Sequence, residues 1–197
     1  MKKWKLRKLE WKTVDAASLD DRTLLLNLYL TQGLTFLLGA VITLFQRNPF
    51  WKQFPADSYS SVLLWGAGLA AAVLSVDLLI SRWVPEEITD DGGINERLFG
   101  NRSLWHLVLI CLIVALCEEI LFRGAVQHAL GAYWTSILFA AIHVRYLRHW
   151  LMTGMVFSIS YGLGWIYIHT GSLLAPVAAH FLIDLVMGLI IRYRKKE

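Results

Sequence analysis

Ionisable side chains inside apolar stretches are the most informative feature of this sequence. Charged groups are costly within a membrane and mark functional sites by default. Seven of them occur: Asp77, Glu118, Glu119, Arg123, His143, His180 and Asp184. Asp77 lies near the end of its apolar stretch, five residues before Arg82, so we interpret it as a structural residue that reaches the interface. The other six define the candidate site.

The motif Cys117-Glu-Glu-Ile-Leu-Phe-Arg-Gly124 holds two adjacent carboxylates and one arginine. On a helix, Glu119 and Arg123 lie four residues apart on one face, in the orientation that favours an ion pair. Glu118 points about 100° away, so the arginine neutralises at most one carboxylate. An ion pair that fixes helix packing accounts for Glu119 and Arg123 and leaves Glu118 available for chemistry.

Two histidines on other apolar stretches are candidate partners for Glu118. His143 follows Phe139 by four residues and His180 precedes Asp184 by four, so each pair lies on one helical face. A carboxylate with imidazoles can activate water as a general base and stabilise an oxyanion, or can hold a divalent metal that does both. Both routes give hydrolysis. With a metal such as Zn²⁺, the ligands would be Glu118, His143 and His180.

The elements that carry these residues are predicted to be membrane helices. Of the 197 residues, 56% are hydrophobic and 17% charged, whereas about 25% are charged in soluble domains. Six continuous apolar segments have spanning length, over residues 23–45, 60–82, 104–127, 132–149, 151–169 and 173–192. We therefore predict an all-α, polytopic helical bundle with about six transmembrane helices.

The distribution of Lys and Arg predicts the orientation of this bundle. With the N-terminus inside, seven of the 19 cations precede the first helix and nine lie in inner loops and the tail, whereas only Arg47 and Lys52 lie outside. Positive residues near helix ends set orientation, so both termini are predicted to be cytoplasmic. The protein would be a multi-pass membrane protein, of the plasma membrane in a prokaryote. The predicted partner of the cations is membrane lipid, not nucleic acid.

Depth in the bilayer constrains the helix boundaries. If the third helix began sharply at Leu104, Glu118 would lie about 21 Å along it in the outer half, whereas His143 would lie near the inner end of the fourth helix. We therefore extend the third helix through Gln127 and the fourth to about Trp150. These boundaries bring the candidate site residues to mid-membrane.

Three motifs in a fixed order carry a resemblance to a known family. They are Glu118-Glu119-x-x-x-Arg123, Phe139-x-x-x-His143 and His180-x-x-x-Asp184. Together they resemble the CPBP family of intramembrane proteases, the CAAX prenyl endopeptidase and bacteriocin-processing group. The resemblance covers about residues 100–192, and the first two helices match only in being helices.

The resemblance implies a role for each motif residue. Glu118 would activate water together with His143, Glu119 and Arg123 would form a structural and orienting pair, and His180 with residue 184 would stabilise the oxyanion. The family usually has Asn at position 184, so Asp184 is a departure that bears on the oxyanion role. Both a metalloprotease mechanism and a metal-free glutamate mechanism have been attributed to the family.

The predicted organisation has four parts. They are a basic cytoplasmic N-terminal segment, two accessory transmembrane helices with a polar loop, a four-helix catalytic core and a basic cytoplasmic tail, over residues 1–22, 23–99, 100–192 and 193–197. The predicted function is an intramembrane endopeptidase that hydrolyses a peptide bond of a membrane-associated or lipidated peptide or protein. Two alternatives stay open: an ion- or proton-coupled transporter, because buried Glu, His and Asp also form relays, and a non-catalytic immunity or binding member of the same family.

Overall fold

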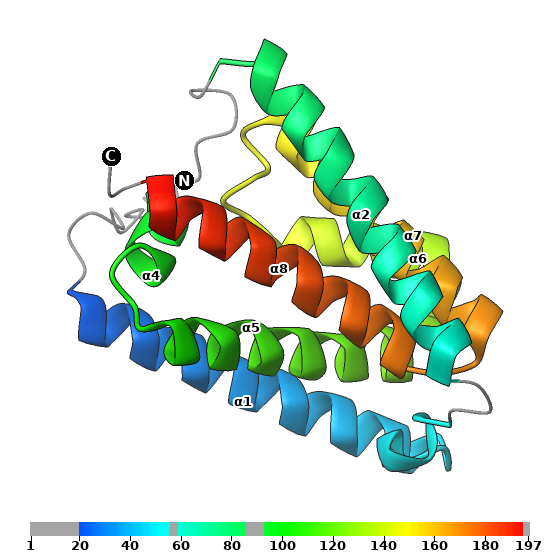
Figure 1. Cartoon of the computed structure of the whole chain (residues 1–197). Coiled ribbons are helices and arrows are strands. Elements are labelled where there is room, and N and C mark those ends of the chain that lie inside the picture. The colour runs from blue at the N-terminus through cyan, green and yellow to red at the C-terminus, as the bar shows by residue number, and fades with distance from the viewer. Residues whose placement is uncertain (1–19, 56–58, 86–92, 195–197) are drawn as a thin grey trace, which may run out of the picture.

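The computed structural model describes residues 20–55, 59–85 and 93–194, and within these ranges the regular structure is entirely helical. The elements are α1 (Asp21–Phe45), η2 (Phe50–Lys52), α2 (Tyr59–Trp83), α4 (Ile94–Phe99), α5 (Leu104–Glu119), the π-helix η3 (Ile120–Val126), α6 (Gln127–Ile142), α7 (Trp150–Thr170) and α8 (Leu174–Arg194) (Figure 1). The prediction of an all-α bundle is confirmed. Most of the predicted N-terminal segment and tail lies outside the described residues.

The outer surface of the bundle is apolar. Among the described residues, five helical stretches are long and apolar enough to cross a membrane, over Asp21–Phe45, Tyr59–Trp83, Leu104–Ile142, Trp150–Thr170 and Leu174–Arg194. Leu34 on α1 and Leu64 on α2 leave 67% and 73% of their surfaces uncovered. Such side chains are stable against lipid, and a helix pairs most of its backbone polar groups within its own segment. The chain is a multi-pass membrane protein.

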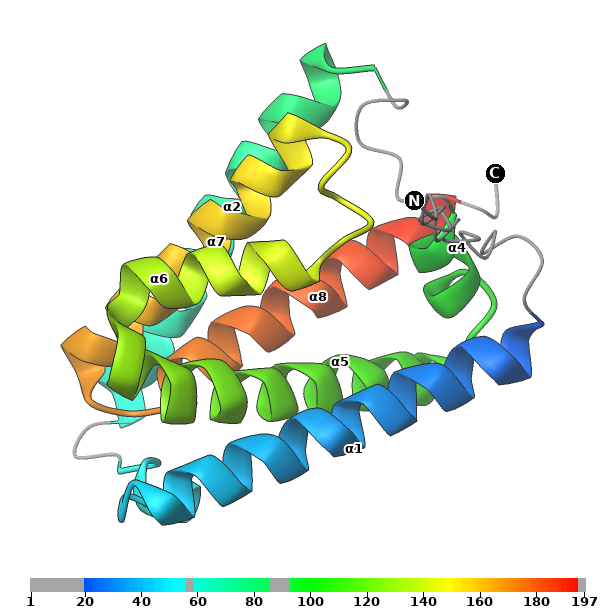
Figure 2. The ribbon, with the colours of Figure 1, turned by 180° about the vertical axis from the view of Figure 1, so that it is seen from behind.

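The predicted third and fourth helices form one continuous stretch with a sharp turn. Gly131 interrupts the helical backbone at φ 72° and ψ 168°, a conformation that is essentially restricted to glycine. Figure 2 shows the chain turning at the end of α5 and running back as α6, which ends beside the middle of α8. Helix α6 therefore extends across only part of the bundle.

The predicted extension of the fourth helix to residue 149 was wrong. Helix α6 ends at Ile142, and His143 has a non-helical backbone with φ −80° and ψ 55°. Residues 143–149 form turns instead, closed by backbone hydrogen bonds such as that from Tyr146 N to His143 O. The imidazole of His143 also binds the Phe139 carbonyl oxygen, which satisfies an acceptor at the helix end. The helix stops in mid-bundle, and this stop sets the depth of His143.

The first and last described helices share one side of the bundle. Helix α1 begins and α8 ends on the side that also carries α4 (Figure 1). There Asp21 pairs with Arg97 at 3.4 Å and with Arg102 at 3.3 Å. A chain whose two ends lie on one side of a membrane crosses it an even number of times, and the charge distribution predicted such an arrangement. That this side is cytoplasmic stays a prediction.

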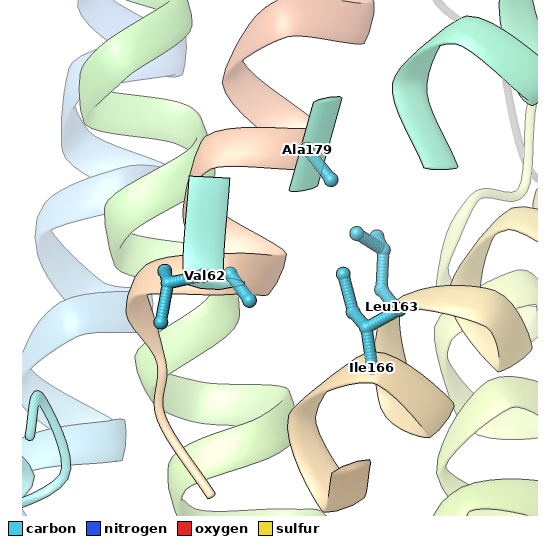
Figure 3. Close-up of a cluster of buried hydrophobic side chains, with 5 residues drawn as sticks. Val62, Leu163, Ile166 and Ala179 are labelled. Carbon is cyan, nitrogen blue, oxygen red and sulfur yellow. The ribbon is translucent and has the colours of Figure 1, made fainter. Parts of the chain in front are cut away.

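A small apolar core joins α2, α7 and α8. Figure 3 shows side chains of its five buried residues, Val62, Leu163, Ile166, Ala175 and Ala179. A Cβ atom at Gly66 would lie 3.0 Å from the Ala175 carbonyl oxygen, so α2 approaches α8 this closely only because no side chain intervenes. Small residues commonly allow such contacts between membrane helices. This packing holds α8, which carries His180 and Asp184, at a fixed position.

Candidate active site

A cavity of about 480 Å³ lies within the bundle and is lined by residues of α1, α2, α4, α5, α6, α7 and α8. The four predicted catalytic residues, Glu118, His143, His180 and Asp184, all line it. They come from the end of α5, the residue after α6 and the middle of α8. Asp77 of α2 lines the same cavity, although we had interpreted it as a structural residue near the interface.

The segment that follows Glu119 and contains Arg123 is a π-helix. Its wider turns leave carbonyl oxygens without their usual helical partners, and such segments are frequent at functional sites. Two glutamines from the preceding part of the chain satisfy these oxygens: Gln46 donates to Ala125 O at 3.0 Å and Gln53 to Gly124 O at 3.2 Å. The π-helix is therefore held from outside by side chains.

Glu119 and Arg123 form a fully buried ion pair. Arg123 Nη1 lies 3.1 Å from Glu119 Oε1, and both side chains are 0% exposed. Arg123 Nη2 also donates to the carbonyl and the hydroxyl oxygen of Ser160 on α7, at 2.8 Å each. The predicted pair on one helical face is thus present, and it also ties α7 to the π-helix.

Glu119 has a second partner that spacing along the sequence did not reveal. Its Oε1 atom lies 2.8 Å from Nδ1 of His180 on α8. An ionised carboxylate only accepts hydrogen bonds, so His180 donates from Nδ1. This contact orients the imidazole and assigns its tautomer, with Nε2 left facing the other way.

Asp184 lies on that other side of His180. The distance from His180 Nε2 to Asp184 Oδ2 is 3.5 Å, the outer limit of a hydrogen bond. Because Glu119 already accepts a hydrogen bond from Nδ1, Asp184 is not needed to fix the tautomer of His180. Its carboxyl group, with 30% of the side chain exposed, is available to the cavity.

His143 is oriented by its own helix. Its Nδ1 atom lies 2.7 Å from the Phe139 carbonyl oxygen, and a carbonyl can only accept, so the proton is assigned to Nδ1. In the neutral ring, Nε2 is then the hydrogen-bond acceptor. The imidazole also packs on the Phe139 ring, with centroids 4.5 Å apart.

Phe139 is the aromatic centre of the site. Arg123 Cζ lies 5.2 Å from the centroid of its ring, and the His180 ring lies 6.5 Å away in an edge-to-face arrangement. Together with His143, these contacts place the Phe139 ring among residues of three helical segments. Phe139 also lines the cavity.

Glu118 is held by a residue of the first helix. Gln32 Nε2 donates to Glu118 Oε1 at 3.0 Å. We had considered only ionisable residues in the apolar segments, so Gln32, Gln46 and Ser160 were missed. An uncharged polar side chain in the middle of an apolar run is the weak signal that identifies Gln32.

The predicted metal ligands do not form a metal-binding group as they are placed here. Among the described residues, no three His, Cys, Asp or Glu side chains gather closely enough to hold a metal ion. The Nδ1 contacts of His180 with Glu119 and of His143 with a carbonyl oxygen are compatible with either case, with or without a metal, because metal-binding histidines commonly make such contacts with the nitrogen that does not bind the metal. We therefore derive no chemical step through a metal.

This fold and cavity define a multi-pass helical membrane protein with a carboxylate–imidazole site, and comparisons with known proteins show the family of the chain. The family model described as type II CAAX prenyl endopeptidase Rce1-like matches residues 100–186. The uncharacterized protein YpbD of Bacillus subtilis (strain 168) is 42% identical over 132 residues, which are 67% of this chain and 70% of that protein. No solved structure matches the chain. The chain belongs to the Rce1-like family of CAAX-type membrane proteases, within the CPBP group that its motifs predicted.

Proposed function

We propose that the protein is an intramembrane endopeptidase that hydrolyses a peptide bond of a membrane-associated or lipidated peptide or protein. The observation that carries this proposal is the presence of Glu118, His143, His180 and Asp184 around one cavity. Family membership supports a protease. The turn-forming segment 143–149 supports access of water, because irregular backbone at membrane depth is tolerated where it lines a water-filled cavity or is buried in protein.

In the proposed reaction, Glu118 is the general base. It takes a proton from water while the water oxygen attacks the carbonyl carbon of the scissile bond, and Nε2 of His143 accepts a hydrogen bond from the same water and orients it. The carbonyl oxygen gains negative charge, which His180 and Asp184 stabilise as hydrogen-bond donors when protonated. The proton on Glu118 then passes to the leaving nitrogen as the C–N bond breaks.

The test is cleavage of a membrane peptide by the purified protein in detergent, with products identified by mass spectrometry. Glu118→Gln is nearly isosteric and removes only the base, so activity should fall about a hundredfold or more. Expression and helicity by circular dichroism should be unchanged. Glu96→Gln is the matched control, since Glu96 is exposed on α4 and is not among the cavity residues. A folded Glu118→Gln protein with full activity would contradict the proposal.

A further inference from the structure

Helix α1 lies outside residues 100–186, which the family model matches, yet it provides a hydrogen bond to Glu118. Gln32 Nε2 donates to Glu118 Oε1 at 3.0 Å, and Gln32 is only 7% exposed. Burying an amide in an apolar helix is unfavourable unless its polar atoms are used. The buried position of Gln32 therefore needs an explanation. Its amide donates to Glu118, the residue that the proposed reaction uses as a base.

Helix α1 is fixed against the segment that follows Glu118. A Cβ atom at Gly39 would lie 2.9 Å from Leu121 Cα, so the backbones of α1 and the π-helix touch there. Two turns further along, Gln46 donates to Ala125 O at 3.0 Å. These contacts hold α1 at a set distance from η3. The amide of Gln32 is consequently presented to Glu118 from a rigid support.

We propose that Gln32 is a positioning residue for Glu118, which makes α1 part of the catalytic unit rather than an accessory helix. This inference rests on the proposed function, in which Glu118 alternates between an ionised and a protonated form. The hydrogen bond fixes Oε1 of the ionised carboxylate and leaves Oε2 to receive the proton of water.

An amide suits this role because it can serve both forms of Glu118. Its NH₂ group donates to the ionised carboxylate, and a half-turn of the amide presents Oε1, which accepts from the protonated carboxyl group. Gln32 Oε1 is buried and has no hydrogen-bond partner among the residues that the structure describes. Turning the amide therefore breaks no second bond. Lysine in this place would support only the ionised form.

The kinetic test uses Gln32→Met, which keeps the shape of the side chain and removes the amide. A hydrogen bond to a charged group is lost, so kcat should fall about tenfold or more with KM unchanged. A lower kcat with an unchanged KM is the readout that a merely structural role would not give. Gln32→Asn keeps a polar amide but is one methylene too short, and should show the same losses. Thr35→Val, on α1 but not among the cavity residues, should match the wild type.

A second measurement needs no turnover. Thermal unfolding in detergent of the wild type, Gln32→Met, Glu118→Ala and the double variant gives a double-mutant cycle. Because the two side chains bind each other, the double variant should lose less stability than the sum of the single losses. An additive cycle, or a wild-type kcat in both Gln32 variants, would overturn the inference alone. Full activity of Glu118→Gln would instead overturn the proposed function and this inference with it.

Discussion

Replacing Arg123 by Ala should destabilise the protein strongly, because the guanidinium group is completely buried and makes three polar contacts. It pairs with Glu119 at 3.1 Å and donates two hydrogen bonds of 2.8 Å to Ser160. Removing one partner of a buried pair costs about 3–5 kcal/mol, because the other charge stays buried. Glu119 keeps His180 as a hydrogen-bond donor, whereas the two acceptor atoms of Ser160 lose their donor. We therefore expect the free energy of unfolding to fall by about 4 kcal/mol.

Thermal unfolding in detergent measures this loss. For a chain of this size, the midpoint falls by about 2–4 °C per kcal/mol, so the Arg123→Ala midpoint should be about 8–16 °C below that of the wild type. Arg148→Ala is the control. Arg148 is exposed in the segment after α6, and its removal should change stability by no more than about 0.5 kcal/mol.

A double variant separates stability from activity. Glu119→Leu combined with Arg123→Met replaces the pair by apolar groups, which should restore part of the stability lost in Arg123→Ala. It should stay inactive, because His180 loses the acceptor that orients its ring. An Arg123→Ala protein that unfolds at the same temperature as Arg148→Ala would refute the reasoning, since the pair could then not be the buried cross-link described above.

Three further predictions concern the cavity and the turn at Gly131. Asp184→Asn should keep or raise cleavage and extend it to higher pH. An amide donates a hydrogen bond without needing to be protonated, whereas an ionised carboxylate cannot donate. Loss of activity at every pH would show instead that the carboxylate supports His180. Cleavage should persist after treatment with a chelator, because the described His, Cys, Asp and Glu side chains do not gather around a common point; loss that added Zn²⁺ reverses would show that the predicted ligands rearrange around a metal. Gly131→Ala should lower the free energy of unfolding by about 1–3 kcal/mol, because φ is 72° at this position. The control is Gly33→Ala on α1, where an added Cβ meets nothing within 4 Å. It should be neutral or stabilising in the same unfolding assay.

The helices themselves could be predicted from continuous apolar runs of spanning length. The first predicted helix, 23–45, differs from α1 only at its start, where Asp20 accepts a hydrogen bond from Thr23 N and begins the helix earlier. The end of α6 could not be predicted in this way. The predicted boundary was set late to bring His143 to mid-membrane, although Arg145, Arg148 and His149 follow Ile142 closely in the sequence.

The contacts between motifs were the part of the site that spacing could not reveal. A separation of four residues identifies neighbours on one helix, such as Glu119 and Arg123 or His180 and Asp184. It says nothing of partners on other helices, such as Glu119 with His180 or Glu118 with Gln32. Those pairs depend on how α1 and α8 lie beside α5, which three-dimensional packing alone determines.

The site divides its two adjacent carboxylates between different surroundings. Glu119 and Arg123 have no exposed surface, whereas Glu118 lines the cavity. In the proposed reaction, Glu119 would serve as a permanent charge and Glu118 as an exchangeable one. In the proposed reaction, Glu118 gains and loses a proton in each turnover. The division lets it do so without loosening the ion pair that holds the helices together.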